Sequence, residues 1–138
     1  MPLALVWPVM AQLLLTFVLI LWNGGLRVGA IRRREVRMRD IALSADAWPE
    51  RVKKVSNNMH NQFETPMLFY VLCGVATYVG ETGVLMTPLA WAWFVSRLVH
   101  TAVHVTVNRV PLRALIFAIG VVILILMWLL ILFRLLGV

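Results

Sequence analysis

The last part of the chain, from Leu112 to Leu136, is apolar almost throughout. Its only charged residues are Arg113, just inside its start, and Arg134, near its end. About 20 consecutive apolar residues are enough for a helix to cross the hydrocarbon core of a bilayer, which is about 30 Å thick. This segment therefore predicts a transmembrane helix, and with it a chain that folds in a membrane.

The composition excludes an ordinary soluble globular protein. Of the 138 residues, 62% are hydrophobic and only 14% are charged, a balance typical of integral membrane proteins. Thirteen basic residues against six acidic ones give a net charge of +7. Nine of the thirteen lie between Arg27 and Lys54, in one polar loop, where the positive-inside rule expects them on the cytoplasmic side of a membrane. We therefore explain the charge by topology and predict no nucleic-acid partner.

The other segments fit an all-α integral membrane protein, a bundle of four transmembrane helices in one domain, residues 1–138. We predict spans at about residues 3–22, 57–79, 88–107 and 112–136, with a basic cytoplasmic loop at about 23–56. Asn23-Gly24-Gly25 is expected to close the first helix. The second helix is expected to begin near Pro49, with its first turns outside the hydrocarbon, and to run to about Val79.

The distribution of lysine and arginine also predicts the orientation. The loop before the second span carries nine basic residues, and the turn before the fourth span carries Arg109. The turn between the second and third spans carries none. Because basic loops stay in the cytoplasm, we expect both termini to lie outside it.

The second span carries polar residues that lipid alone would not tolerate. Asn57, Asn61 and Glu64 follow an i, i+4, i+7 spacing that places them on one face of a helix, and His60 lies beside that face. A charged side chain at the centre of a span costs about 2.5–3.5 kcal/mol on insertion scales. Such residues normally face a protein interior and mark a functional site.

The third span has a similar polar face, formed by Arg97, His100, Thr101 and His104 at i, i+3, i+4 and i+7. We expect the two faces to point at each other, and Glu64 to form an ion pair with Arg97. The same residues could instead only hold the helices together, as polar groups do in membranes. A site and a purely structural role both stay open, and the number of polar residues on the two faces favours a site.

Arg113 is informative separately, because it lies two residues after Pro111, which is well placed to open a helix. The free backbone N–H groups of a helix start, together with a guanidinium, would attract an anion. Alternatively, Arg113 could extend to cytoplasmic lipid headgroups. The sequence leaves these two interpretations equally open.

No metal site is expected. His100 and His104 have a spacing that could bind a metal, but no carboxylate accompanies them on that helix, and the chain contains no HExxH pattern. The lone Cys73 lies in an apolar run. It predicts neither a disulfide framework nor a thiolate ligand set, and we expect a small core or lipid-facing residue.

The ordered combination of Asn61-x-x-Glu64, Arg97-x-x-His100-Thr101 and Pro111-x-Arg113 resembles the MAPEG family, the membrane-associated proteins in eicosanoid and glutathione metabolism. The detailed similarity spans about residues 57–114, and the four-span layout covers the chain. The resemblance implies a homotrimer, and a bacterial-type member implies the bacterial inner membrane.

The resemblance also implies a function. Glutathione would bind between subunits near the cytoplasmic side and react with a lipophilic small molecule that enters from the bilayer. Arg113 falls on the arginine that stabilises the glutathione thiolate in several members, and is the predicted catalytic residue. The predicted glutathione-binding residues are Asn57, His60, Asn61, Glu64, Arg97, His100 and His104.

Four positions depart from the family pattern. Arginines of well-characterised glutathione-using members are replaced by Asn57 and His60, a common tyrosine by His104, and a serine that follows the thiolate arginine by Ala114. The loss of these two arginines weakens the expected binding of the glutathione carboxylates. Arg27, Arg32 or Arg33 could substitute for them.

Three hypotheses follow from these residues. The leading one is a glutathione transferase or peroxidase that acts on lipophilic electrophiles. The alternative is a non-catalytic lipid- or partner-binding module with the same fold, which the two replaced arginines favour. A small transporter with a proton relay through His100, His104 and Glu64 is the least favoured, because the sequence carries no signal of a discontinuous helix.

Overall fold

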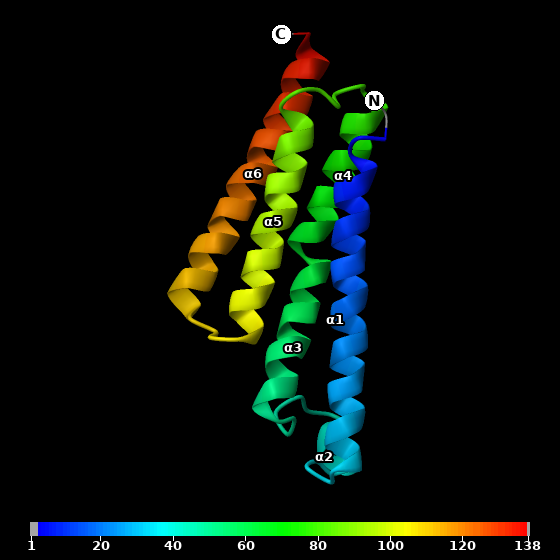
Figure 1. Ribbon diagram of the computed structural model, residues 1–138, viewed down its shortest axis with the longest axis vertical. Coiled ribbons are helices and arrows are strands. Elements are labelled where there is room, and N and C mark those ends of the chain that lie inside the picture. Colours follow the sequence, from blue (N-terminus) through cyan, green and yellow to red (C-terminus); the bar gives the residue numbers. More distant parts are fainter. Residues whose placement is uncertain (1–2, 138) are drawn as a thin grey trace.

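The computed structural model describes residues 3–137, and all the regular secondary structure in that range is helical. The helices form an elongated bundle (Figure 1). α3 and α4 follow one another in a single column between α1 and α5, and α6 returns beside α5. The bounds are α1 Val6–Arg32, α2 Met38–Ile41, α3 Glu50–His60, the 3₁₀ helix η1 Asn61–Phe63, α4 Thr65–Tyr78, α5 Met86–Val105 and α6 Val110–Leu136.

Two of these helices, α1 and α6, are long and apolar enough to cross a membrane. Each has 27 residues, which corresponds to about 40 Å at 1.5 Å per residue. Each is therefore longer than a hydrocarbon core of about 30 Å. The last turns of α1, which carry Arg27 and Arg32, extend to the end of the bundle where α2 and the basic loop lie (Figure 1).

The prediction that Asn23-Gly24-Gly25 ends the first helix is wrong, since α1 continues to Arg32. Glycine costs only about 1 kcal/mol relative to alanine inside a helix, and contacts with α3 offset that cost. The Arg27 guanidinium donates to the Ser56 hydroxyl at 3.0 Å from within these last turns. The contact with α3 thus keeps α1 helical beyond the glycines that would otherwise end it.

The second helix begins at Glu50, close to the predicted start, but it is interrupted before it reaches Tyr78. The α-helical pattern tightens to a 3₁₀ turn at Asn61–Phe63 and resumes at Thr65. Pro66 explains the break, because proline has no N–H to donate and its ring clashes with the carbonyl of the residue four positions earlier. The premise that no helix is discontinuous is therefore wrong for this one, although α3 and α4 stay in one column (Figure 1).

The apolar core lies between the helices at the end of the bundle away from the basic loop. Phe69 of α4 stacks on Trp93 of α5, with ring centroids 4.1 Å apart and planes at 13°. Gly120 of α6 lets α5 approach closely, because a Cβ there would lie 3.2 Å from the Ser96 hydroxyl. Cys73 is buried in this core as a free thiol, which confirms its expected role as a small core residue.

The basic loop is held by ion pairs of its own. Glu35 contacts both Arg33 and Arg51, and thereby joins the loop to α3. The Arg27 guanidinium lies 5.1 Å from the centre of the Trp48 ring, a cation–π contact. The hydrogen bond and charge of Lys54 lower the pKa of Glu50 at the start of α3.

Candidate functional site

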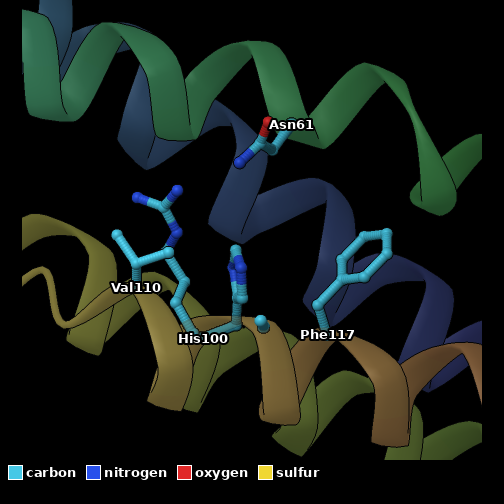
Figure 2. Close-up of a pocket in the computed structure, with 6 residues that line it drawn as sticks. Asn61, His100, Val110 and Phe117 are labelled. Carbon is cyan, nitrogen blue, oxygen red and sulfur yellow. The ribbon is translucent and has the colours of Figure 1, made fainter.

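A pocket of about 240 Å³ lies where α5 turns into α6, opposite η1. Figure 2 shows Asn61 and His100 on opposite sides of this pocket, with their side chains directed toward each other. Val110 and Phe117 of α6 close two further sides (Figure 2). The complete lining is Asn61, His100, Val110, Arg113, Ala114 and Phe117.

The turn between α5 and α6 positions Arg113. Asn108 adopts a left-handed conformation there, with φ of 48°, and its N–H donates to the carbonyl of Val103 at 2.8 Å. Its side-chain oxygen accepts a hydrogen bond of 2.7 Å from Nη1 of Arg113. Asn108 therefore both ends α5 and holds one side of a half-buried guanidinium in the first turn of α6.

The polar face of α5 turns into the bundle as predicted. Arg97, His100, Thr101 and His104 are all at most 6% exposed. The rings of His100 and His104 meet edge to face with centroids 5.8 Å apart, and His100 also lies 6.2 Å from the ring of Phe117. Of these four residues, only His100 lines the pocket of Arg113.

The second helix turns a different face into the bundle from the one that was predicted. Asn57, His60 and Glu64 are exposed on the single chain, and Asn61 is half-buried at the pocket. The inner face of α3 is set by the buried Val52 and Val55, and the α-helical period places Asn57 and Glu64 on the opposite side. The side chains that turn inward on this helix are Ser56, Asn58 and Gln62.

In the part of the chain that the structure describes, Glu64 and Arg97 do not form the predicted ion pair. Glu64 lies at the helix break and is exposed, so its charge acts on Arg97 only from a distance. The Arg97 guanidinium instead donates from Nη2 to the backbone carbonyl of Asn61 at 3.4 Å. The break supplies this acceptor, because a 3₁₀ turn leaves backbone carbonyls without α-helical partners.

A chain of buried amides crosses the bundle behind the pocket. Gln12 of α1 donates to the side-chain oxygen of Gln62 at 2.8 Å, and Gln62 donates to the side-chain oxygen of Asn58 at 3.3 Å. Asn58 in turn lies 3.2 Å from Nδ1 of His104. All four side chains are at most 3% exposed. Each amide nitrogen in this chain donates to the next residue, and the last hydrogen bond reaches the ring of His104. The orientation of every side-chain amide is therefore fixed.

Three buried polar atoms beside the pocket have no protein partner within residues 3–137. They are Nδ1 of His100, Nε of Arg97 and the hydroxyl oxygen of Thr101. Buried polar groups normally find a partner in protein, water or ligand. His100 is the one of the three residues that also lines the pocket, so its ring borders the space that a bound molecule would fill. No group of three or more His, Cys, Asp or Glu side chains in the described range could hold a metal ion.

Three members of the amide chain were not predicted from the sequence: Gln12, Asn58 and Gln62. Gln12 is an isolated amide in an otherwise apolar helix, with Thr16 one turn later. Asn58 and Gln62 are spaced i, i+4, one position out of phase with the face that was predicted. A lone amide in a membrane helix is the signal that could have found them, because it needs a partner on another helix.

An all-helical bundle with two helices long and apolar enough to cross a bilayer, and with polar groups gathered inside it, is the architecture expected of an integral membrane protein. The model of the MAPEG family matches residues 5–133, almost the whole chain. The chain therefore belongs to the MAPEG family, whose members are membrane proteins of glutathione and eicosanoid metabolism and generally use glutathione. No curated protein and no solved structure matches the chain.

Proposed function

We propose that this protein is a glutathione-dependent membrane enzyme, of the transferase or peroxidase type, that acts on lipophilic electrophiles. The single observation that carries the proposal is the pocket at the α5–α6 turn. It brings together Arg113, His100 and Asn61 from three helical segments, in a chain of a family that generally uses glutathione.

Arg113 is the proposed catalytic residue, because its guanidinium lines the pocket and is oriented by Asn108. Glutathione supplies a thiolate nucleophile when it is bound. A free thiol has a pKa of about 8.5, and each unit by which a neighbouring cation lowers it corresponds to about 1.36 kcal/mol. A guanidinium in the first turn of a helix adds to the positive potential of the free N–H groups there.

The residues present fit the thiol end of glutathione better than its carboxylate ends. His100 offers a buried ring nitrogen without a protein partner in the described chain, and Asn61 offers a half-buried amide. Arg113 is the only cationic side chain in the lining. The two carboxylates of glutathione therefore require cations from outside this pocket.

A homotrimer would supply that missing part. Asn57, His60 and Glu64 are exposed on one face of the single chain, and polar groups on a lipid-facing surface are costly. A neighbouring subunit packed on this face would cover them and could bring basic side chains toward the pocket. We propose that Asn57, His60, Asn61, Glu64, Arg97, His100 and His104 form or brace the glutathione site in this assembly.

We further propose that the columns α1, α3–α4, α5 and α6 are the four spans of a single domain, residues 1–138. The basic loop between α1 and α3 would lie in the cytoplasm and both termini outside it, since nine basic residues lie between Arg27 and Lys54. The bacterial inner membrane is the proposed location. Lipophilic substrates would then enter the pocket from the bilayer.

Conjugation of glutathione to a generic electrophile tests the proposal. The protein is purified in detergent and compared with Arg113→Ala and Arg113→Lys. We expect a loss of about 10–100-fold in rate for alanine, equivalent to about 1.4–2.7 kcal/mol. Arg109→Ala is the matched control, because Arg109 is exposed one turn earlier and does not line the pocket. An absence of glutathione binding at millimolar concentration would reject the proposal.

One observation favours the alternative of a non-catalytic lipid- or partner-binding module. A groove of about 340 Å³ between α4 and α6 is lined by apolar side chains and Thr65, whose buried hydroxyl has no partner in the described part of the chain. Such a groove suits an acyl chain. This function predicts that lipid co-purifies in the groove and that its retention is the same in the wild type and in Arg113→Lys.

A further inference from the structure

A second cavity, of about 430 Å³, lies between α1, α3 and the end of α5, and shares no lining residue with the pocket of Arg113. α3 lies between α1 and α5 at this level of the bundle (Figure 1). The apolar wall is formed by Trp22 and Leu26 of α1, Val55 of α3 and Val105 of α5. The proposed enzymatic function uses none of these four side chains.

The charged part of this cavity is formed by Glu50, Arg51 and Lys54, all near the start of α3. The Lys54 ammonium lies 2.9 Å from a carboxylate oxygen of Glu50, and Arg51 pairs with Glu35. The Glu50 side chain is 81% exposed, whereas that of Lys54 is only 26% exposed. Because an i, i+4 pair with so exposed a carboxylate is weak, the ammonium can exchange it for another anion.

The polarity of the cavity changes along the axis of the bundle. On α3 the charged side chains come first, beside the basic loop, and Val55 follows deeper in the bundle. On α1, Trp22 lies deeper and Leu26 nearer the loop. A phospholipid in that leaflet has the same order, with its phosphate outside and its acyl chains inside, and tryptophan is enriched at this boundary.

The charge of the surroundings selects among phospholipids. The segment from Arg27 to Lys54 contains nine basic and four acidic side chains, a net charge of +5. Basic pockets between helices on the cytoplasmic side favour anionic headgroups over zwitterionic ones. We propose that this cavity binds an anionic phospholipid, with the phosphate between Arg51 and Lys54 and an acyl chain along Trp22 and Val105.

Lipid titration of the full-length protein tests this site. The protein in neutral detergent is titrated with dioleoyl phosphatidylglycerol or dioleoyl phosphatidylcholine, and bound lipid and the thermal unfolding midpoint are measured. We expect phosphatidylglycerol to bind at least ten times more tightly and to be the only one that raises the midpoint. Equal binding and equal midpoints for the two lipids would overturn the proposal.

Charge variants locate the site. The double variant Arg51→Gln, Lys54→Gln should lose the preference for phosphatidylglycerol, and Glu35→Gln, which frees the Arg51 guanidinium, should keep or strengthen it. Lys53→Gln is the matched control, because Lys53 lies between the two on the same helix but does not line the cavity. If Lys53→Gln loses as much preference as the double variant, the attraction is diffuse and the site does not exist.

Two further experiments keep the test valid if the double variant misfolds, and distinguish a lipid phosphate from a free phosphate. Val105→Trp fills the apolar wall without changing any charge, and should weaken phosphatidylglycerol binding at least tenfold. Glycerol phosphate alone should leave the midpoint unchanged. If it raises the midpoint as much as the lipid does, the acyl chain contributes nothing and the assignment is wrong. None of these measurements involves glutathione, so they test the lipid site independently of the proposed enzymatic function.

Discussion

The side-chain nitrogen of Asn58 lies 3.2 Å from Nδ1 of His104, in the interior of the bundle. Gln62 donates to the side-chain oxygen of Asn58, so the Asn58 nitrogen is the group that faces the ring. Nδ1 therefore accepts, and a neutral His104 ring carries its proton on Nε2. The chain of amides that begins at Gln12 thus sets the tautomer of a histidine next to His100.

Removal of the buried Asn58 side chain should destabilise the protein far more than removal of the exposed Asp46 side chain. Asn58→Ala leaves Gln62 and His104 without their partner in the interior, which costs about 1–3 kcal/mol for an unsatisfied buried polar group. Asp46→Ala alters an exposed side chain of the basic loop, outside the proposed glutathione site, and should change stability by less than about 0.5 kcal/mol. Unfolding in mixed micelles by a denaturing detergent measures both, and equal losses would contradict the role of the amide chain.

Gln12 and Gln62 should be energetically coupled. In a double-mutant cycle with Gln12→Leu and Gln62→Leu, each single change leaves the other amide without its hydrogen-bond partner. The double change removes both amides. We expect a coupling energy of about 0.5–1.5 kcal/mol from the free energies of unfolding. A control cycle that pairs Gln12→Leu with Asn57→Ala should show additivity, because Asn57 does not contact Gln12. Additivity in the first cycle would mean that the hydrogen bond contributes nothing.

Gly120 should resist substitution where Gly74 does not. A Cβ at Gly120 would lie 3.2 Å from the Ser96 hydroxyl, which itself donates to the carbonyl of Trp93 at 2.7 Å, whereas a Cβ at Gly74 meets nothing within 4 Å. Gly74→Ala should therefore gain helix propensity, up to about 1 kcal/mol, and Gly120→Ala should not. Adding Ser96→Ala to Gly120→Ala should restore the gain. Identical unfolding energies for the two glycine variants would contradict the close α5–α6 contact.

Asn108 should affect activity through its side chain and stability through its backbone. Asn108→Gly keeps the left-handed conformation but removes the acceptor of Arg113, so glutathione conjugation should fall about tenfold with little loss of stability. Asn108→Ala removes the same acceptor and also strains the backbone, at a further cost of about 1–2 kcal/mol. Steady-state kinetics and thermal unfolding of the two variants separate these effects. Full activity in Asn108→Gly would show that Arg113 needs no such anchor.

Much of the architecture could be predicted from hydrophobicity and charge. The segment from Leu112 to Leu136 is apolar except for Arg113 and Arg134, and it forms α6 within two residues of the predicted start. The polar face of α5 was also predictable, because the i, i+3, i+4, i+7 spacing of Arg97 to His104 falls within one uninterrupted α-helix. Where the backbone keeps the ideal period, the sequence pattern is enough to tell inside from outside.

The inner face of the second helix was predicted wrongly, because it was assigned from the polar residues alone. Val52 and Val55 are buried on this helix, and the α-helical period places Asn58 and Gln62 on their side. Pro66 gave a local reason for the break at Asn61–Phe63. Gln12 was missed for a different reason, since its partner lies 50 positions away in the chain and no local pattern joins them.

An ultraviolet titration of the bound thiol tests most directly whether the pocket beside Arg113 holds glutathione as its thiolate. With the wild type and with Arg109→Ala, we expect the pKa of the bound thiol to fall clearly below the free value of about 8.5. With Arg113→Ala it should return to the free value. A bound thiol with an unshifted pKa in the wild type, or one that is lowered equally in Arg113→Ala, would contradict the account.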